Sequence, residues 1–198
     1  MSFPAFYPIF DDVSWVRRLV PLGIKAVQLR IKDRSVEDLR HQITEARDFC
    51  AVHGAILVVN DYWRLAIELR CEWLHLGQED LDVADLDEIR GAGLKLGIST
   101  HDRAELERAL ALRPNYIALG PIYPTITKEM KWRRQGPGKL TEWKASAGDV
   151  PLVAIGGMSV ERAATAFAAG ADAISAITDI TLHASPEDRV RAWLDTCG

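Results

Sequence analysis

The sequence predicts an α/β fold, a compact (β/α)8 TIM barrel that forms a single domain over residues 1–198. Eight short apolar segments alternate along the chain with amphipathic segments of helical periodicity. Polar residues recur at the points where the apolar segments end. Strands that alternate with helices form parallel sheets, and eight such units allow the sheet to close into a barrel with one chemically active rim.

The eight expected strands are residues 5–10, 26–31, 55–60, 73–77, 95–99, 116–120, 151–156 and 172–177. The segment after the second strand shows how the helices are expected to begin and end. It starts at Ser35, an N-cap residue type, and closes at Gly54, a C-cap residue type. Its apolar residues fall on one helical stripe: Val36, Leu39, Ile43, Ala46, Phe49 and Cys50. Residues 159–170 repeat this pattern.

The alternative architecture is an open, doubly wound sheet, which usually carries a GxGxxG turn after its first strand. Here the first strand leads into residues 11–14, which contain no glycine, so the barrel is favoured. One connection is long, because residues 121–150 separate the sixth and seventh strands, although residues 140–147 are expected to form a helix. Long connections in compact domains are usually functional or disordered.

Composition excludes several classes of protein. A net charge of −4 argues against a general nucleic-acid binder, which would carry a basic face. No apolar stretch is long enough for a membrane helix, and the N-terminus lacks the pattern of a secretory signal. The three cysteines lack CxxC spacing and are interpreted as reduced thiols. The expectation is a cytoplasmic protein with small-molecule partners and no nucleic-acid or membrane partner.

The second strand carries a polar face. Gln28, Arg30 and Lys32 alternate with apolar residues, so the three share one side of the strand. In a barrel this side points inward and toward the rim, and two neighbouring cations there require anions to neutralise them. The alternative is an edge strand with a solvated face, but a closed barrel has no edge.

An acidic residue follows each of the third and fourth strands. Asp61 comes directly after Asn60 at the end of the third strand, and Asp80 comes after Gln78 at the end of the fourth. Neighbouring strand ends bring two carboxylates close enough to share one cation, and such a sparse pair suits Mg²⁺ beside phosphate oxygens. The alternative makes each acid a helix N-cap. Together with the cations of the second strand, the acids indicate a metal–diphosphate site.

Further candidates lie at later strand ends. Gly157 and the pair Ile177-Thr178 follow the seventh and eighth strands, where barrels often bind phosphate through backbone N–H groups. The long sixth connection is basic, and we expect a lid at Thr125, Thr127 and Lys128. For Lys131, Arg133 and Arg134 a solvated face is expected at least as much as a place in the lid. His75 is expected in the core or at the rim, and His101 at a catalytic position after the fifth strand.

Eight stretches carry a resemblance: residues 28–32, 59–66, 75–81, 97–101, 116–120, 124–128, 153–157 and 175–178. Together, and in this order, they resemble the thiamine phosphate synthase family along the whole chain. The stretch after Lys128 departs from the family, because Arg133-Arg134 precede Gln135-Gly136 where a short proline-bearing connection is common.

The resemblance implies a transferase of thiamine biosynthesis, with Mg²⁺ as cofactor. It would condense a hydroxymethylpyrimidine diphosphate with a thiazole phosphate to give thiamine phosphate and diphosphate. Residues for the pyrimidine and its diphosphate would be Gln28, Leu29, Arg30, Ile31, Lys32, Asn60, Ser99 and Lys128, of which Arg30, Lys32 and Lys128 are catalytic. Asp61 and Asp80 would hold the metal. Residues for the thiazole phosphate would be Thr125, Ile126, Thr127, Gly157, Ile177 and Thr178.

Two other functions remain open from the residues. Some barrel relatives are thiazole tautomerases, in which a histidine near the end of the fifth strand moves a proton. His101 occupies such a position, so this function stays open. A tautomerase has no need for both acids and the cations of the second strand. A non-catalytic sensor of thiamine precursors is the third possibility, and the complete polar set argues against it. The sequence leaves the oligomeric state open.

Overall fold

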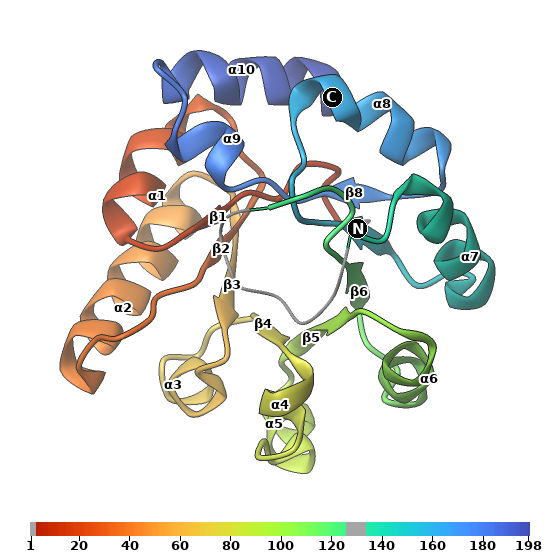
Figure 1. Cartoon of the computed structure of the whole chain (residues 1–198). Helices are drawn as coiled ribbons and strands as arrows, with labels where there is room; N and C mark the ends of the chain where they lie inside the picture. Colours follow the sequence, from red (N-terminus) through yellow and green to blue (C-terminus); the bar gives the residue numbers. More distant parts are fainter. Residues whose placement is uncertain (1–2, 126–133) are drawn as a thin grey trace.

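The structure is a computed structural model of the whole chain, and it describes residues 3–125 and 134–198. Eight parallel strands pair in sequence order. They are β1 (Ile9–Phe10), β2 (Ala26–Leu29), β3 (Ile56–Asn60), β4 (Trp73–Leu76), β5 (Lys95–Thr100), β6 (Tyr116–Leu119), β7 (Leu152–Ala154) and β8 (Ala173–Ile174). The sheet curls into a barrel, as Figure 1 shows.

The barrel closes through main-chain hydrogen bonds between β8 and the segment around β1. Tyr7 N donates to Ile174 O at 2.9 Å, and Ile174 N donates to Ala5 O at 2.8 Å. One step further along, Ile9 N donates to Ala176 O at 3.0 Å. The predicted (β/α)8 fold is therefore confirmed.

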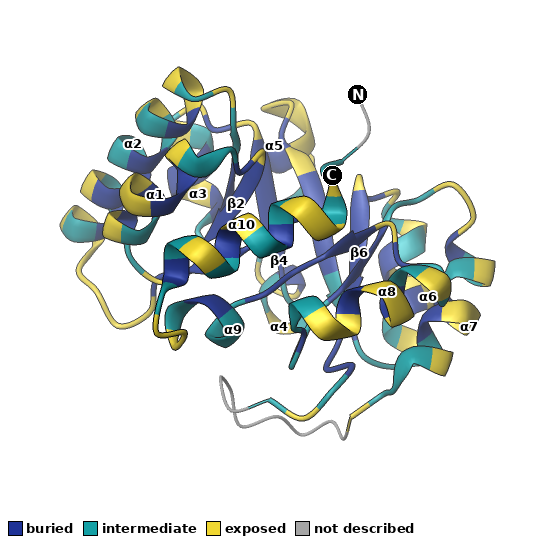
Figure 2. Ribbon diagram, turned by 90° about the horizontal axis from the view of Figure 1, so that it is seen from above, coloured by how far each residue is buried: buried dark blue, intermediate teal, exposed yellow. Residues whose placement is uncertain are grey.

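Helices surround the sheet and turn their exposed faces outward (Figures 1 and 2). They are α1 (Val13–Leu19), α2 (Val36–Val52), α3 (Trp63–Glu68), α4 (Gln78–Leu81), α5 (Leu86–Gly91), α6 (Arg103–Ala111), α7 (Pro137–Ala147), α8 (Val160–Ala168), α9 (Thr178–Thr181) and α10 (Pro186–Cys197). A 3-10 turn, Val20–Leu22, follows α1. Among the described helices, none is long and apolar enough to cross a membrane.

The structure confirms that α2 begins after Ser35 and ends before Gly54. Ser35 is its N-cap, with the side-chain oxygen accepting from Asp38 N at 3.2 Å, and Gly54 follows the helix with a φ of +62°. Val36 is an exception to the predicted stripe, because it is 63% exposed. The buried stripe begins at Leu39, one turn into the helix.

Two apolar cores hold the barrel. The larger lies between the outer face of the sheet and the helices, and it includes Val27 and Leu29 of β2. The smaller fills the barrel interior and includes Tyr7, Trp73 and Tyr116. Alternation along each strand sends neighbouring side chains to opposite cores. The interior core lies beneath the rim and supports the site.

Candidate active site

A pocket of about 420 Å³ opens at the carboxyl ends of the strands. Its walls include nine residues that the sequence predicts for the site: Gln28, Arg30, Asn60, Asp80, Ser99, Thr125, Gly157, Ile177 and Thr178. These residues follow or end β2, β3, β4, β5, β6, β7 and β8. Ligand sites in this class of barrel occupy the same face. The structure therefore brings together the residues predicted from separate parts of the chain.

Other predicted residues lie elsewhere. The side chains of Leu29 and Ile31 are each 2% exposed and pack in the outer core, so only their main chain could meet a ligand. β2 ends at Leu29, and Lys32 lies beyond it with a side chain that is 47% exposed. Three predicted residues lie outside the described part of the chain: Ile126, Thr127 and Lys128.

Lys32 forms an ion pair with Asp61 beside the pocket. Asp61 comes directly after β3 and has a φ of +66°, a region that residues other than glycine seldom adopt. Its main chain is held there, because Asp61 N donates to His75 O at 2.9 Å. Backbone strain of this kind concentrates at functional sites.

Asp80 completes a pair of neighbouring carboxylates. Burial and the nearby charge of Asp61 raise the pKa of Asp80 above its usual value. Two carboxylates that disfavour each other's charge are a donor set that a divalent cation would relieve. Neither acid is itself an N-cap, since Tyr62 and Gly77 occupy those positions. Asp80 does serve the start of α4, because Gly77 N donates to its carboxylate at 3.1 Å.

These two acids fit Mg²⁺ better than a cation that needs many protein ligands. In the described part of the chain, no group of three or more His, Cys, Asp or Glu side chains could hold a metal. Mg²⁺ is usually bound by one or two carboxylates together with substrate phosphates and water. Asp61 and Asp80 match that requirement when a diphosphate supplies the remaining oxygens.

A chain of buried hydrogen bonds crosses the barrel beneath the pocket. Gln28 Nε2 donates to the Tyr7 hydroxyl at 2.5 Å, and the hydroxyls of Tyr7 and Tyr116 lie 2.7 Å apart. The Tyr116 hydroxyl lies 2.8 Å from His75 Nδ1, and His75 Nε2 lies 2.8 Å from Ser99 Oγ. Because its two ends, Gln28 and Ser99, line the pocket, the chain holds opposite walls in a defined orientation.

Three buried polar atoms of the described side chains have no hydrogen-bond partner: Asn60 Nδ2, Gln78 Oε1 and Ser175 Oγ. All three residues line the pocket. Leaving a buried polar group unpaired costs free energy, and such groups are rare in folded proteins unless a ligand or water satisfies them. Their convergence on one cavity therefore indicates a ligand that donates and accepts hydrogen bonds there.

The wall formed by the loops after β7 and β8 presents backbone N–H groups to the pocket. Within the described residues, no oxygen accepts a hydrogen bond from the N–H of Gly157, Ile177 or Thr178. Gly157 has a φ of +62°, and a Cβ there would lie 2.4 Å from the carbonyl oxygen of Pro124. Only glycine fits this turn. Backbone N–H groups at such a turn form an anion-binding site.

Comparison with known proteins decides the family. Residues 7–180 match the family model described as thiamine monophosphate synthase. The chain belongs to the thiamine monophosphate synthase family. It is accordingly an enzyme, a transferase of thiamine biosynthesis.

Curated relatives of this thiamine monophosphate synthase family member cover it almost completely. A thiamine-phosphate synthase of Rhizobium etli is 56% identical over 98% of this chain and 95% of its own length. A thiamine-phosphate synthase of Salmonella schwarzengrund is 44% identical over 97% of this chain and 91% of its own length.

Solved structures support the fold at lower identity. A thiamine phosphate pyrophosphorylase from Pyrococcus furiosus superposes with a TM-score of 0.86 and 23% identity, over 97% of this chain and 94% of the other. A 3-hexulose-6-phosphate synthase from Salmonella typhimurium superposes with a TM-score of 0.69 and 12% identity, over 98% of each chain. Both similarities concern the barrel fold alone.

Sequence reasoning missed several residues of this thiamine monophosphate synthase site. Ser175 could have been found, because Ala173, Ser175 and Ile177 alternate along one strand and so share its inward face. Glu105 could also have been found from its spacing. It lies four residues after His101 on α6, and its carboxylate is 2.7 Å from His101 Nδ1.

Proposed function

We propose that the protein condenses a hydroxymethylpyrimidine diphosphate with a thiazole phosphate to give thiamine phosphate and diphosphate. One observation carries the proposal: a single pocket lies between a cationic and carboxylate rim on one side and unpaired backbone N–H groups on the other. Two anionic substrates that meet head to head require such a division. Family membership supports the same reaction.

The pyrimidine would lie against Gln28, Asn60 and Ser99. Gln28 Nε2 is engaged by Tyr7, which leaves Gln28 Oε1 to accept a hydrogen bond from the 4-amino group of the ring. Asn60 Nδ2 is buried without a partner and would donate to a ring nitrogen or a diphosphate oxygen. His75 holds the Ser99 hydroxyl in the wall of the same pocket. These contacts would orient the methylene carbon toward the open side of the pocket.

The diphosphate would bind at Arg30, Lys32 and Lys128. Arg30 lines the pocket, and in the described part of the chain no acceptor engages its guanidinium. A planar guanidinium can bind two phosphate oxygens at once. Mg²⁺ held through Asp61 and Asp80 would supply further neutralisation of charge on the diphosphate. As the diphosphate departs, Arg30 and the two lysines would stabilise its growing negative charge.

The thiazole phosphate would be received by the loops after β6, β7 and β8. Gly157, Ile177 and Thr178 offer their N–H groups, and the resemblance adds Thr125, Ile126 and Thr127 as residues that would contact the anion. This arrangement would hold the thiazole nitrogen facing the methylene carbon of the pyrimidine.

The bond changes need no protein nucleophile. The C–O bond of the pyrimidine diphosphate would break, with its electron pair leaving on the diphosphate. The 4-amino group can delocalise the positive charge left on the methylene carbon, so a dissociative path is favoured. The lone pair of the thiazole nitrogen would then form the new C–N bond, and the positive charge would end on the thiazolium. Excluding water from the pocket protects the cation from capture.

Thiazole tautomerisation is a second candidate, because His101 lines the pocket and Glu105 orients its imidazole. Such a dyad could move a proton on a bound thiazole. It gives no role to Asp61, Asp80 or Arg30, so condensation explains more of the site. A non-catalytic sensor of thiamine precursors explains neither the paired acids nor the chain's membership in an enzyme family.

We further propose that residues 1–198 act as one domain in the cytoplasm. Cys50 and Cys71 are buried free thiols, and burial raises the pKa of Cys50 to about 12, so this thiol stays protonated and unreactive. Reduced cysteines are typical of that compartment.

Product analysis tests the reaction. Purified protein is incubated with both substrates and Mg²⁺, and thiamine phosphate is measured by mass spectrometry. We expect product from the wild type and from Arg40→Lys, a control that changes an exposed ion pair with Glu68. Arg30→Lys should lose most of the activity at an unchanged Tm, because the planar fork is lost. Full activity of Arg30→Lys would contradict the assignment of the diphosphate site.

A further inference from the structure

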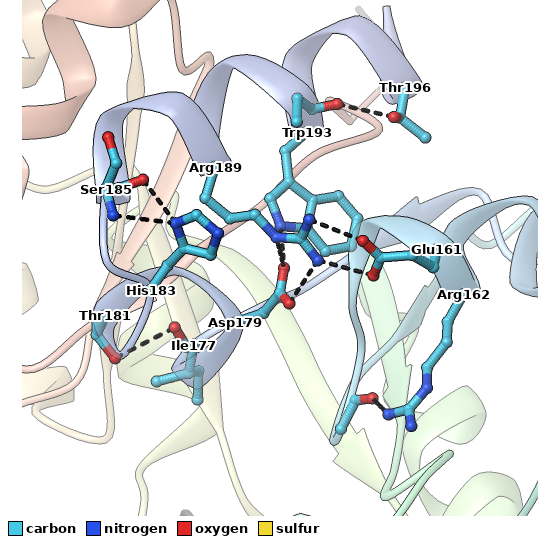
Figure 3. Close-up of polar contacts among 12 residues, drawn as sticks. Glu161, Arg162, Ile177, Asp179, Thr181, His183, Ser185, Arg189, Trp193 and Thr196 are labelled. Atoms are coloured by element: carbon cyan, nitrogen blue, oxygen red, sulfur yellow. Dashed lines mark hydrogen bonds and ion pairs between the residues drawn. The ribbon is translucent and has the colours of Figure 1, made fainter.

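Arg189 of α10 joins two helices through four hydrogen bonds (Figure 3). Its Nε and Nη2 donate to the two carboxylate oxygens of Asp179, each at 2.8 Å. Its Nη1 and Nη2 donate to the carboxylate oxygens of Glu161 at 2.8 and 2.7 Å. One guanidinium thus forms two bidentate pairs, which we call the Arg189 clamp (Glu161, Asp179 and Arg189).

The two acids of the clamp hold equivalent positions in the fold. Asp179 is the second residue of α9 and follows Thr178 directly, at the loop after β8. Glu161 is the second residue of α8 and lies shortly after Gly157, at the loop after β7. Arg189 therefore joins α9, which begins at the unpaired N–H group of Thr178, to α8, which begins three residues after that of Gly157.

The Arg189–Asp179 pair of the clamp is anchored in the core, whereas the side chain of Glu161 is 68% exposed. The side chains of Arg189 and Asp179 are 15% and 14% exposed. Trp193 Nε1 also donates to Asp179, at 2.8 Å, and the Trp193 ring stacks on Phe6 with 5.1 Å between centroids. Hydrogen bonds from Arg189 lower the pKa of Glu161 to about 2, so this acid stays ionised at neutral pH. A bidentate pair restricts geometry as well as contributing energy, and the shielded pair with Asp179 is the stronger of the two constraints.

The positive charge of Arg189 also neutralises the carboxylate of Asp179. A carboxylate one residue beyond Thr178 would repel a phosphate bound at that loop. Arg189 engages both oxygens of Asp179 and neutralises them. A lysine could not replace it, because an ammonium group cannot form two bidentate pairs.

We propose that Arg189 is a positioning residue for the phosphate-bearing substrate, holding the loops after β7 and β8 in register and cancelling the charge of Asp179. The proposal rests on the proposed function, which assigns the thiazole phosphate to these loops. Arg189 itself touches no substrate and takes no part in the bond changes. Its loss should therefore weaken recognition of the phosphate while leaving the pyrimidine side of the pocket unaltered.

The test compares Arg189→Lys and Arg189→Gln with Arg18→Lys. Arg18 is a matched control, because it also forms a bidentate pair with a glutamate of α10, Glu187, and neither residue lines the pocket. Steady-state kinetics give KM for each substrate and kcat. Both Arg189 variants should raise KM for the thiazole phosphate about tenfold or more, with KM for the pyrimidine diphosphate and kcat within about twofold. The same thiazole without its phosphate should react equally with all variants.

A second readout does not depend on turnover. Hydrogen–deuterium exchange is measured with and without inorganic phosphate. In the wild type and Arg18→Lys, phosphate should protect the amides of residues 156–161 and 177–181, and this protection should disappear in the Arg189 variants. Absence of turnover in the wild type would overturn the proposed reaction while this readout still tests the clamp. The clamp is overturned if Arg189→Lys keeps both the phosphate-dependent protection and the wild-type KM.

Discussion

His75 Nδ1 lies 2.8 Å from the Tyr116 hydroxyl oxygen, with both side chains buried inside the barrel. Its other ring nitrogen lies 2.8 Å from Ser99 Oγ. Burial lowers the pKa of His75 to about 4, so the imidazole is neutral at physiological pH. A neutral imidazole donates at one nitrogen and accepts at the other, which matches the two hydroxyl partners.

Acid should therefore destabilise the protein through His75. The folded pKa lies below the unfolded value of about 6.5, so the unfolded state binds more protons between these two values. The contribution of His75 to the free energy of unfolding is complete above pH 6.5. It is lost as the pH falls from there through about 4, and the total loss is up to roughly 3 kcal/mol. Urea unfolding at pH 7.5 and near pH 5 measures this loss. His75→Gln should reduce the pH dependence, whereas His41→Gln, on an exposed histidine, should not.

Gly97→Ala should disturb the same chain of buried hydrogen bonds through Tyr116. A Cβ at Gly97 would lie 2.0 Å from a ring atom of Tyr116, so the ring must move. Overpacking of this kind costs about 1–3 kcal/mol of unfolding free energy. Gly91→Ala is the matched control, because nothing lies within 4 Å of a Cβ there. Equal stability of the two variants in urea would show that Gly97 is not needed to accommodate Tyr116.

Metal binding should depend on both acids. Asp61→Asn and Asp80→Asn each remove a charge but keep an oxygen, so the new amide in Asp80→Asn can still accept from Gly77 N. We expect Mg²⁺ and diphosphate together to raise the Tm of the wild type, and each variant to lose most of this shift. Asp87→Asn, at a side chain that is 98% exposed, should behave as the wild type. An undiminished shift in both site variants would remove these acids from the metal site.

Lys128 and His101 should separate condensation from tautomerisation. Lys128→Ala should slow thiamine phosphate formation strongly, by about a hundredfold, because it removes a cation expected to face the departing diphosphate. His101→Ala should have a smaller effect, since condensation transfers no proton there. Lys139→Ala, which removes an ion pair with Glu142 on the same connection, serves as a control. An indispensable His101 with a dispensable Lys128, and thiazole turnover without pyrimidine, would favour the tautomerase.

Local pattern was sufficient to predict the fold and the rim. Alternation in β2 placed Gln28 inside the barrel, where it is 2% exposed, and Ser35 and Gly54 marked the ends of α2 because their chemistry acts within a single turn. Asn60 and Asp80 were predicted from their positions at strand ends, and both line the pocket.

Relationships that depend on register could not be predicted in this way. The contact between Tyr7 and Tyr116 depends on how β8 meets β1 when the barrel closes, and no local pattern encodes that pairing. The Arg189 clamp joins three helices through tertiary geometry alone. For Leu29 and Ile31, alternation correctly predicted an outward face, which is why their side chains lie away from the pocket that the resemblance assigned to them.

Release of diphosphate, followed by ³¹P NMR, tests the central claim most directly. The wild-type protein is given Mg²⁺ with the pyrimidine diphosphate alone, with the thiazole phosphate alone, and with both. We expect free diphosphate only when both are present, in a one-to-one ratio with thiamine phosphate, because without the thiazole the cation recombines with diphosphate in a pocket that excludes water. Diphosphate release without thiazole, or conversion of thiazole without pyrimidine, would contradict condensation as the function of this pocket.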